Sequence, residues 1–207
     1  MNSFPMEPFI KYLLPSILIF WMMGCPLQQD TEMETKVYGR ENIENDSLHV
    51  ALNLEEYDDW DSLYNRVNNI VCTDSTPYLS FTADGIKKSV YIYNRCSTVM
   101  LCPTSRNTLM IVNDTIHRMD PKSLLDSLGS EMKKHYTNQG ESRYYSEKPE
   151  HFMVSIAYSG RGVDKLPNLL NRITNIYDDV NPRTELAIVL DQPPPPPPKN
   201  NNQERND

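Results

Sequence analysis

Residues 108–118 have the sequence TLMIVNDTIHR, in which an apolar run is followed by a polar pair, Asn113-Asp114, and by a second short run. This order predicts a strand over 108–112, a turn at the polar pair and a returning strand after it. Asp120-Pro121 comes next, and aspartate at a helix cap with proline in the first helical turn is typical of a helix start. The pattern therefore predicts a strand pair followed by a helix that ends near Tyr136.

Similar periodic patterns continue toward the C-terminus. Alternating apolar residues predict a strand over 152–158, and a wholly apolar run predicts an internal strand over 186–190. Between them, apolar residues with helical spacing predict a helix that starts at Asp164. The loop Ser159-Gly160-Arg161-Gly162 has two interpretations. It is a cradle for a phosphate or carboxylate, or a plain strand-to-helix turn, since it lacks the spacing of a dinucleotide-binding loop.

The first half of the chain also mixes strand and helix patterns. An alternating strand pattern begins at Leu48, and an apolar helix face extends over 60–71. Two β-rich runs, 78–82 and 89–93, flank Asp84-Gly85. This pair favours a hairpin, because both central positions of a type I′ turn need positive φ.

Two distant helical segments are similar in sequence. Residues 63–70 are LYNRVNNI and residues 169–176 are LLNRITNI. At the same offset, Asp58 falls on Asp164. A duplicated strand–helix–strand unit is one explanation, and chance similarity between two amphipathic helices is the other.

Charge and composition limit the classes of partner. The chain has 207 residues and a formal net charge of −8, which excludes the basic footprint of a nucleic-acid-binding surface and a polybasic membrane patch. Residues 25–47 are acidic with almost no apolar periodicity, and they are predicted to form a flexible acidic tether. The run Pro193–Pro198 predicts a polyproline II rod, which is either a ligand for an aromatic groove or a solvated extension.

An apolar run over 13–24 follows Lys11 and ends at Cys25. A basic segment, an apolar core and a small residue at the cut site are the parts of a secretory signal peptide, predicted here over 1–24. A transmembrane anchor is one alternative, but the run falls short of the roughly 20 residues that span a bilayer. A buried core helix is another, but the run has no amphipathic face.

The residues Met22-Met23-Gly24-Cys25 resemble the lipobox of bacterial lipoproteins, with Met22 where leucine is usual. The resemblance implies cleavage before Cys25 and acylation of its thiol, for example by palmitate, so that the acyl chains hold the protein on a membrane. Pro26 stands where an inner-membrane retention signal would have aspartate. The outer membrane is therefore the expected location, on its periplasmic or surface face.

If Cys25 is acylated, three further cysteines remain, and an odd number permits one disulfide and one free thiol. Cys96 and Cys102 flank a short segment and are the predicted pair in an oxidising envelope. The alternative is that Cys72, Cys96 and Cys102 are three buried thiols.

No catalytic residues, cofactor or metal site are predicted. The four histidines lack metal-ligand spacing, and the acidic run 55–61 lacks the glycine and spacing of an EF-hand loop. A solvated, helix-starting acidic turn explains that run. A non-enzymatic protein is expected, and the alternative is a lipid-tethered envelope hydrolase whose site the sequence does not reveal.

The order of elements from Leu109 to Leu190 resembles the periplasmic domain of the ExbD/TolR family. The residues that carry the resemblance are Ile111-Val112-Asn113-Asp114, Asp120 to Leu128, Val154 to Ala157, Leu166 to Ile176 and Glu185 to Leu190. It implies a small α+β module that forms a homodimer and binds another envelope protein or the cell wall, as an accessory to biopolymer transport. Family members couple a proton gradient through an aspartate in an N-terminal membrane helix, and residues 9–24 contain no acidic residue.

The predicted fold class is thus α+β, with a small mixed sheet and two to three amphipathic helices packed on one face. The expected parts are a signal peptide (1–24), an acidic tether (25–47), a strand–helix–hairpin portion (48–106), an ExbD/TolR-like portion (107–190) and a disordered Pro-rich tail (191–207). The expected function is that of a lipid-anchored binding or assembly module of the cell envelope.

Overall fold

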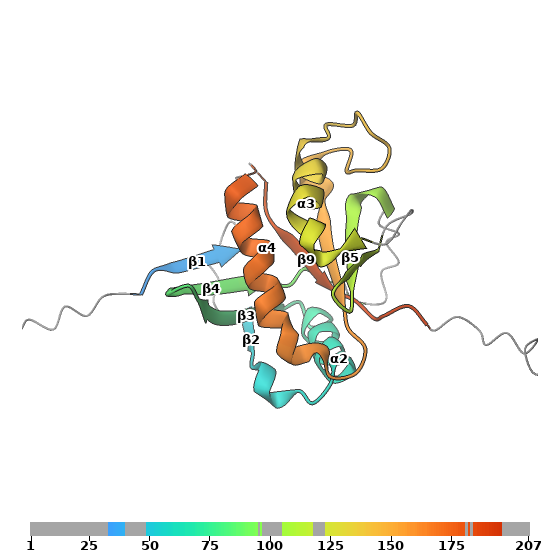
Figure 1. Cartoon of the computed structure of the whole chain (residues 1–207). Helices are drawn as coiled ribbons and strands as arrows, with labels where there is room; N and C mark the ends of the chain where they lie inside the picture. Colours follow the sequence, from blue (N-terminus) through green and yellow to red (C-terminus); the bar gives the residue numbers. More distant parts are fainter. Residues whose placement is uncertain are drawn as a thin grey trace, which may run out of the picture. The chain divides into compact units, whose positions relative to one another are not determined.

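The computed structural model describes residues 33–39, 49–94, 96, 105–117, 123–180, 182 and 184–195, all within one compact unit that begins at Met33 (Figure 1). The predicted signal peptide, the predicted lipidation site Cys25, the helix-start pair Asp120-Pro121 and Cys102 lie outside these residues. Among the described helices, none is long and apolar enough to cross a membrane.

Four strands form the first sheet, in the order β1-β4-β3-β2. Their bounds are Thr35–Tyr38 (β1), His49–Leu52 (β2), Thr76–Ala83 (β3) and Ile86–Tyr91 (β4). β3 and β4 are antiparallel, while β1 pairs with β4 and β2 pairs with β3 in parallel. The predicted hairpin at Asp84-Gly85 is confirmed, and φ is 55° and 76° at these two residues.

The second sheet has five strands in the order β7-β6-β5-β8-β9. Their bounds are Thr108–Val112 (β5), Thr115–His117 (β6), Ser123–Leu124 (β7), Met153–Ala157 (β8) and Ala187–Leu190 (β9). β5, β8 and β9 are parallel, and β6 pairs antiparallel with β5 and β7. The predicted turn at Asn113-Asp114 is confirmed, and both residues have positive φ.

In the described part of the chain, three α-helices accompany the sheets: Trp60–Val71 (α2), Leu128–Thr137 (α3) and Leu166–Val180 (α4). Short 3-10 turns occur at Leu54–Glu56 (η2), Ser105–Asn107 (η3), Leu125–Ser127 (η4), Pro149–His151 (η5) and Gly162–Lys165 (η6). Asp59 caps α2, since its carboxylate accepts a hydrogen bond of 2.8 Å from the backbone N–H of Ser62. α4 lies in front of both sheets in Figure 1, between α3 and strands β1 and β4.

The two sheets are joined where the chain leaves β4. Ile92 forms a parallel bridge with Ile188 of β9, and the backbone N–H of Tyr93 donates to the carbonyl of Ile188. The Asn94 side chain continues this pairing, because it donates to the carbonyl of Leu190 and accepts from its N–H, both at 2.8 Å. The buried apolar side chains of both sheets and the three helices accordingly form one cluster.

The predicted α+β class, with mixed strands and amphipathic helices, is confirmed, but the prediction of a single sheet is wrong. A period-two pattern identifies strands but does not show which strands pair. The predicted helix start at Asp120 is also too early, since Ser123–Leu124 is a strand and α3 begins at Leu128. Leu124 is 75 % exposed, so the apolar pattern that predicted the helix includes a residue that lies before the helix and faces solvent.

The predicted tether contains a strand, although its acidic composition did not indicate one. β1 lies within 25–47 and pairs along its whole length with β4. Tyr38 is buried, and the Lys36 ammonium lies 2.9 Å from a carboxylate oxygen of Asp178 on α4. Tertiary contacts rather than a local apolar pattern therefore hold β1 in place.

The predicted disulfide between Cys96 and Cys102 is wrong, because Cys96 is bonded to Cys72. Cys72 follows the last turn of α2, and the segment after β4 runs beside that turn, where Asn94 donates to the side chain of Asn68. The bond therefore joins two segments that folding brings together, with a sequence separation of 24 residues.

The two similar helical segments lie in equivalent units. β2, α2 and β3 form a strand–helix–strand unit with parallel strands, and β8, α4 and β9 form another. The shared pattern therefore corresponds to the same supersecondary structure, once in each sheet.

Candidate functional site

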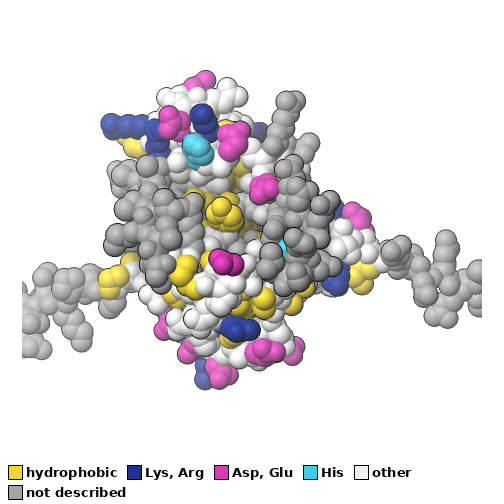
Figure 2. Space-filling model, turned by 180° about the vertical axis from the view of Figure 1, so that it is seen from behind, with side chains coloured by type: hydrophobic (Ala, Val, Ile, Leu, Met, Phe, Trp, Pro, Cys, Tyr) yellow, Lys and Arg dark blue, Asp and Glu magenta, His cyan; other side chains and the backbone are white. Residues whose placement is uncertain are grey.

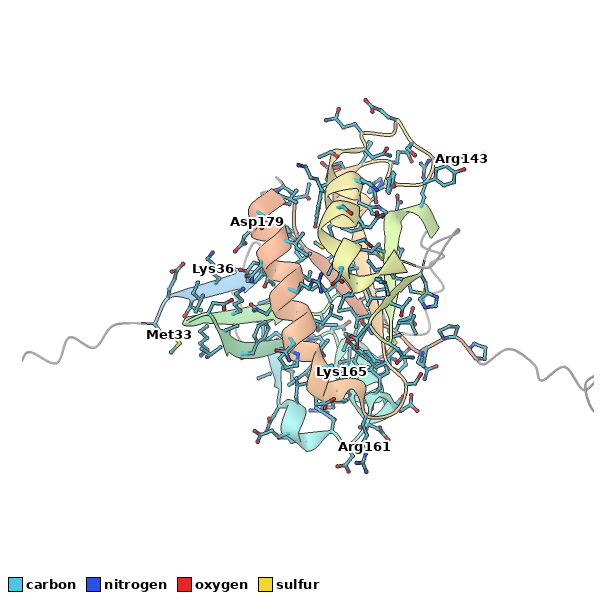
Figure 3. The ribbon with its side chains drawn as sticks, in the orientation of Figure 1. Met33, Lys36, Arg143, Arg161, Lys165 and Asp179 are labelled. Atoms are coloured by element: carbon cyan, nitrogen blue, oxygen red, sulfur yellow. A yellow bond between two sulfur atoms is a disulfide. The ribbon has the colours of Figure 1, made fainter. Side chains whose placement is uncertain are left out.

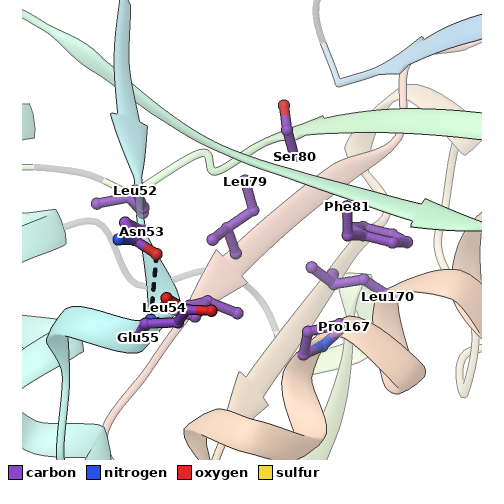
Figure 4. Close-up of a pocket in the computed structure, with 9 residues that line it drawn as sticks. All are labelled: Leu52, Asn53, Leu54, Glu55, Leu79, Ser80, Phe81, Pro167 and Leu170. Carbon is purple, nitrogen blue, oxygen red and sulfur yellow. Dashed lines mark hydrogen bonds between the residues drawn. The ribbon is translucent and has the colours of Figure 1, made fainter.

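A groove of about 280 Å³ lies between the first sheet and the start of α4 (Figure 4). Strands β2 and β3 contribute Leu52, Leu79 and Phe81, and α4 contributes Pro167 and Leu170. Leu52 and Leu79 are register partners and both are buried, which shows that this is the inner face of the sheet. The groove wall is thus mainly apolar.

The turn η2 forms the mouth of the groove. The Asn53 side chain accepts a hydrogen bond of 3.3 Å from the backbone N–H of Glu55, which turns the chain after β2 (Figure 4). Leu54 then lines the groove, with Glu55 and Ser80 as further polar lining residues. A concave apolar surface with a few polar groups suits an apolar side chain of a partner.

A buried lysine lies next to the groove. Lys88 is the cross-strand partner of Phe81 and is only 1 % exposed. Its ammonium donates to three neutral groups on α4: the Asn171 side chain at 2.7 Å, Thr174 at 3.1 Å and Asn175 at 2.5 Å. Burial lowers the pKa of Lys88 below 10.5, because removal from water disfavours the charged form. The bonds fix α4 against the sheet, and the burial keeps a substrate away from the amine.

A second polar cluster joins the carboxyl ends of β5 and β8. The Asn113 side chain accepts from the N–H of Ser159 at 2.8 Å and donates to its hydroxyl at 3.2 Å. Asp114 accepts from the hydroxyl of Tyr158 at 2.5 Å and from Lys165 at 2.9 Å. Burial opposes ionisation of Asp114, but these two hydrogen bonds outweigh it and hold the pKa of the carboxyl below 3.8.

The glycines before α4 have a structural reason. A Cβ atom on Gly162 would lie 2.2 Å from the Cβ of Tyr158, so only glycine lets the loop approach that ring. Gly160 has φ of +62°. With Ser159 held by Asn113, these contacts favour the plain strand-to-helix turn over the anion cradle.

One serine–histidine pair is formed among the residues that the structure describes, but it lacks access to solvent. The Oγ and the backbone N of Ser146 both lie 3.1 Å from Nδ1 of His135. Both residues are buried, and the His135 ring stacks on Phe152 at 4.5 Å. Because the same ring nitrogen accepts the backbone N–H of Ser146, the pair secures the loop after α3 and does not favour a hydrolase.

No metal centre is formed by the described residues, among which no group of three or more His, Cys, Asp or Glu side chains could hold an ion. Within the acidic run 55–61, Asp59 caps α2, and its hydrogen bonds from Ser62 hold the pKa of the carboxyl below 3.8. Charges of both signs are interspersed on the described surface of the face in Figure 2.

Sequence reasoning missed the groove and Lys88. The groove joins β2 and β3 to a helix more than eighty positions away, so no local pattern contains it. The sequence does contain one sign of the buried lysine, because Lys88 lies two positions before Val90 and shares the inner face of β4 with it. A lysine at an apolar position of a period-two pattern is the signal that could have found it.

No family model matches this chain, and no match was found among curated proteins or solved structures.

Proposed function

We propose that this chain is a lipid-anchored protein of the bacterial cell envelope that acts as a non-enzymatic binding or assembly module. The observation that carries the proposal is the disulfide between Cys72 and Cys96. Such bonds persist in oxidising compartments and are rare in the cytosol. A disulfide therefore agrees with export, and export agrees with the apolar run that ends at Cys25.

The second sheet supports a relationship to the ExbD/TolR periplasmic domain. Its elements β5, β6, α3, β8, α4 and β9 follow the order on which the resemblance rests, with the Asn-containing turn after β5, and the short strand β7 is an addition between β6 and α3. On this basis we infer a role beside a biopolymer transport system, in which the module binds an envelope protein or the cell wall. The outer membrane is the proposed location, on its periplasmic or surface face.

The groove is the proposed contact surface for an envelope protein. Its apolar lining suits an aliphatic or aromatic side chain, and it adjoins β2, an edge strand of the first sheet. An extended partner segment could lie along such an edge and place one side chain in the groove. The acyl chains on Cys25 would keep the module close to membrane-bound partners.

The test compares the full-length wild type with two full-length variants in pull-downs from native membranes. Leu54→Asp adds a charge at the groove mouth, and Thr82→Asp adds the same charge at an exposed position of β3. A partner that binds through the groove is lost with Leu54→Asp, by about tenfold or more, because an unpaired carboxylate would be buried. Thr82→Asp should retain it.

Equal recovery with both variants would contradict the groove as the contact surface. Absence of any envelope partner from the wild-type pull-down would contradict the binding-module proposal. Circular dichroism of the purified chains checks that both variants keep the wild-type fold.

A further inference from the structure

Among the described strands, β1 lies at the edge of the first sheet. It pairs with β4, and no other described strand pairs with it. The backbone N–H of Lys87 donates to the carbonyl of Glu34 at 2.9 Å, so the ladder extends one residue before the strand. Exposed edges of this kind present backbone groups that can pair with another chain.

The direction of these backbone groups follows from the Glu34 bond. Successive residues of a strand direct their backbone groups to opposite sides, so Glu34 and Lys36 face β4. Thr35 and Val37 then direct their N–H and C=O groups to the open side. In an antiparallel pair, residues with outward-facing groups lie opposite one another and exchange two hydrogen bonds.

The side chains along this edge are self-complementary in one register. If two copies pair antiparallel about Thr35, each Glu34 lies opposite Lys36 of the other copy. On the outer face, Met33 lies opposite Val37, and these two side chains are 52 % and 41 % exposed. Figure 3 shows Met33 at the start of β1 and Lys36 further along it.

We propose that β1 is a homodimerisation surface, on which two copies of this chain pair antiparallel with Thr35 at the two-fold axis. Each ion pair and each apolar pair then occurs twice, as in any isologous interface. The contact would join two four-stranded sheets into one. It goes beyond the proposed anchor and groove, and its test is independent of both.

Neighbouring registers are less favourable. A two-fold axis at Lys36 places two ammonium groups directly opposite each other, and like charges in that position are destabilising. An axis at Val37 places Lys36 opposite Tyr38, so the Glu34–Lys36 ion pairs and the Met33–Val37 contacts between the copies are both lost. Charge and apolar contacts therefore select the register centred on Thr35.

The test is a charge exchange measured by sedimentation equilibrium of the full-length chain in density-matched detergent. Glu34→Lys and Lys36→Glu should each raise the dimer dissociation constant by about tenfold, because each creates two like-charge pairs. The double variant Glu34→Lys/Lys36→Glu should return it to near the wild-type value. Lys133→Glu, a charge reversal at an exposed position of α3, is the matched control and should change nothing.

Lys36 also pairs with Asp178 within the same chain, so Lys36→Glu alone could act through the fold. The double variant separates these effects, since it restores the contact between copies and leaves the Asp178 pair broken. Failure of the double variant to recover would overturn the proposal. A wild-type chain that stays monomeric at about 100 times the micromolar concentration expected for such a contact would overturn it too. Val37→Pro removes an outward N–H and should abolish the dimer while leaving the monomer folded.

Discussion

Replacement of Trp60 by alanine is expected to lower the free energy of unfolding by about 3–5 kcal/mol. Trp60 is fully buried, and its ring meets that of Tyr158 edge to face at 5.3 Å. Its indole N–H donates to the carbonyl of Asp191 at 2.7 Å, and its backbone N–H donates to the carbonyl of Gly160 at 2.8 Å. The start of α2 is thereby attached to the loops that follow β8 and β9, so the substitution opens a cavity where both sheets meet.

Trp60→Phe is the matched control, since it keeps an aromatic ring but removes the indole donor. Its expected cost is about 1–2 kcal/mol, the range for a lost hydrogen bond to a partly buried carbonyl. Urea unfolding followed by circular dichroism measures both values. A loss below about 1 kcal/mol for Trp60→Ala would show that this junction does not support the fold.

Loss of the Cys72–Cys96 bond is expected to lower the free energy of unfolding by about 3–4 kcal/mol. The bond closes a loop with a sequence separation of 24 residues, and the constraint acts mainly on the unfolded chain. The double variant Cys72→Ser/Cys96→Ser removes it without leaving a lone thiol at either position.

Reductant provides the control for the disulfide. Reduced wild-type protein should unfold at the same urea concentration as the double serine variant, and the variant should not respond to reductant. A wild-type chain whose stability is unchanged by reductant would contradict the Cys72–Cys96 bond.

Local patterns predicted the parts of the fold that local chemistry determines. The pairs Asp84-Gly85 and Asn113-Asp114 form turns because their residues accept positive φ. Helices α2 and α4 follow their apolar faces, with buried side chains at three- and four-residue spacing. The prediction that β9 is internal is wrong, because β9 is the edge strand of the second sheet and only an isolated bridge from Ile92 lies on its outer side.

Features that depend on distant parts of the chain could not be predicted. β1 has only one buried apolar side chain, Tyr38, and owes its place to β4 and Asp178. The partner of Cys96 depends on where α2 ends, which spacing between cysteines does not reveal. Lys88 is buried because three acceptors on α4 surround its ammonium. The lipid anchor and the ExbD/TolR relationship stay predictions.

The anchor is tested most directly by mass spectrometry of the N-terminal tryptic peptide from the membrane fraction of cells that make the full chain. Trypsin cleaves after Lys36, so a processed lipoprotein should yield a peptide of residues 25–36 that begins with an acylated Cys25. A peptide of residues 12–36 with an unmodified Cys25 would show that the segment before it is retained and that the thiol carries no lipid. That result would contradict the proposal of a lipid-anchored envelope protein.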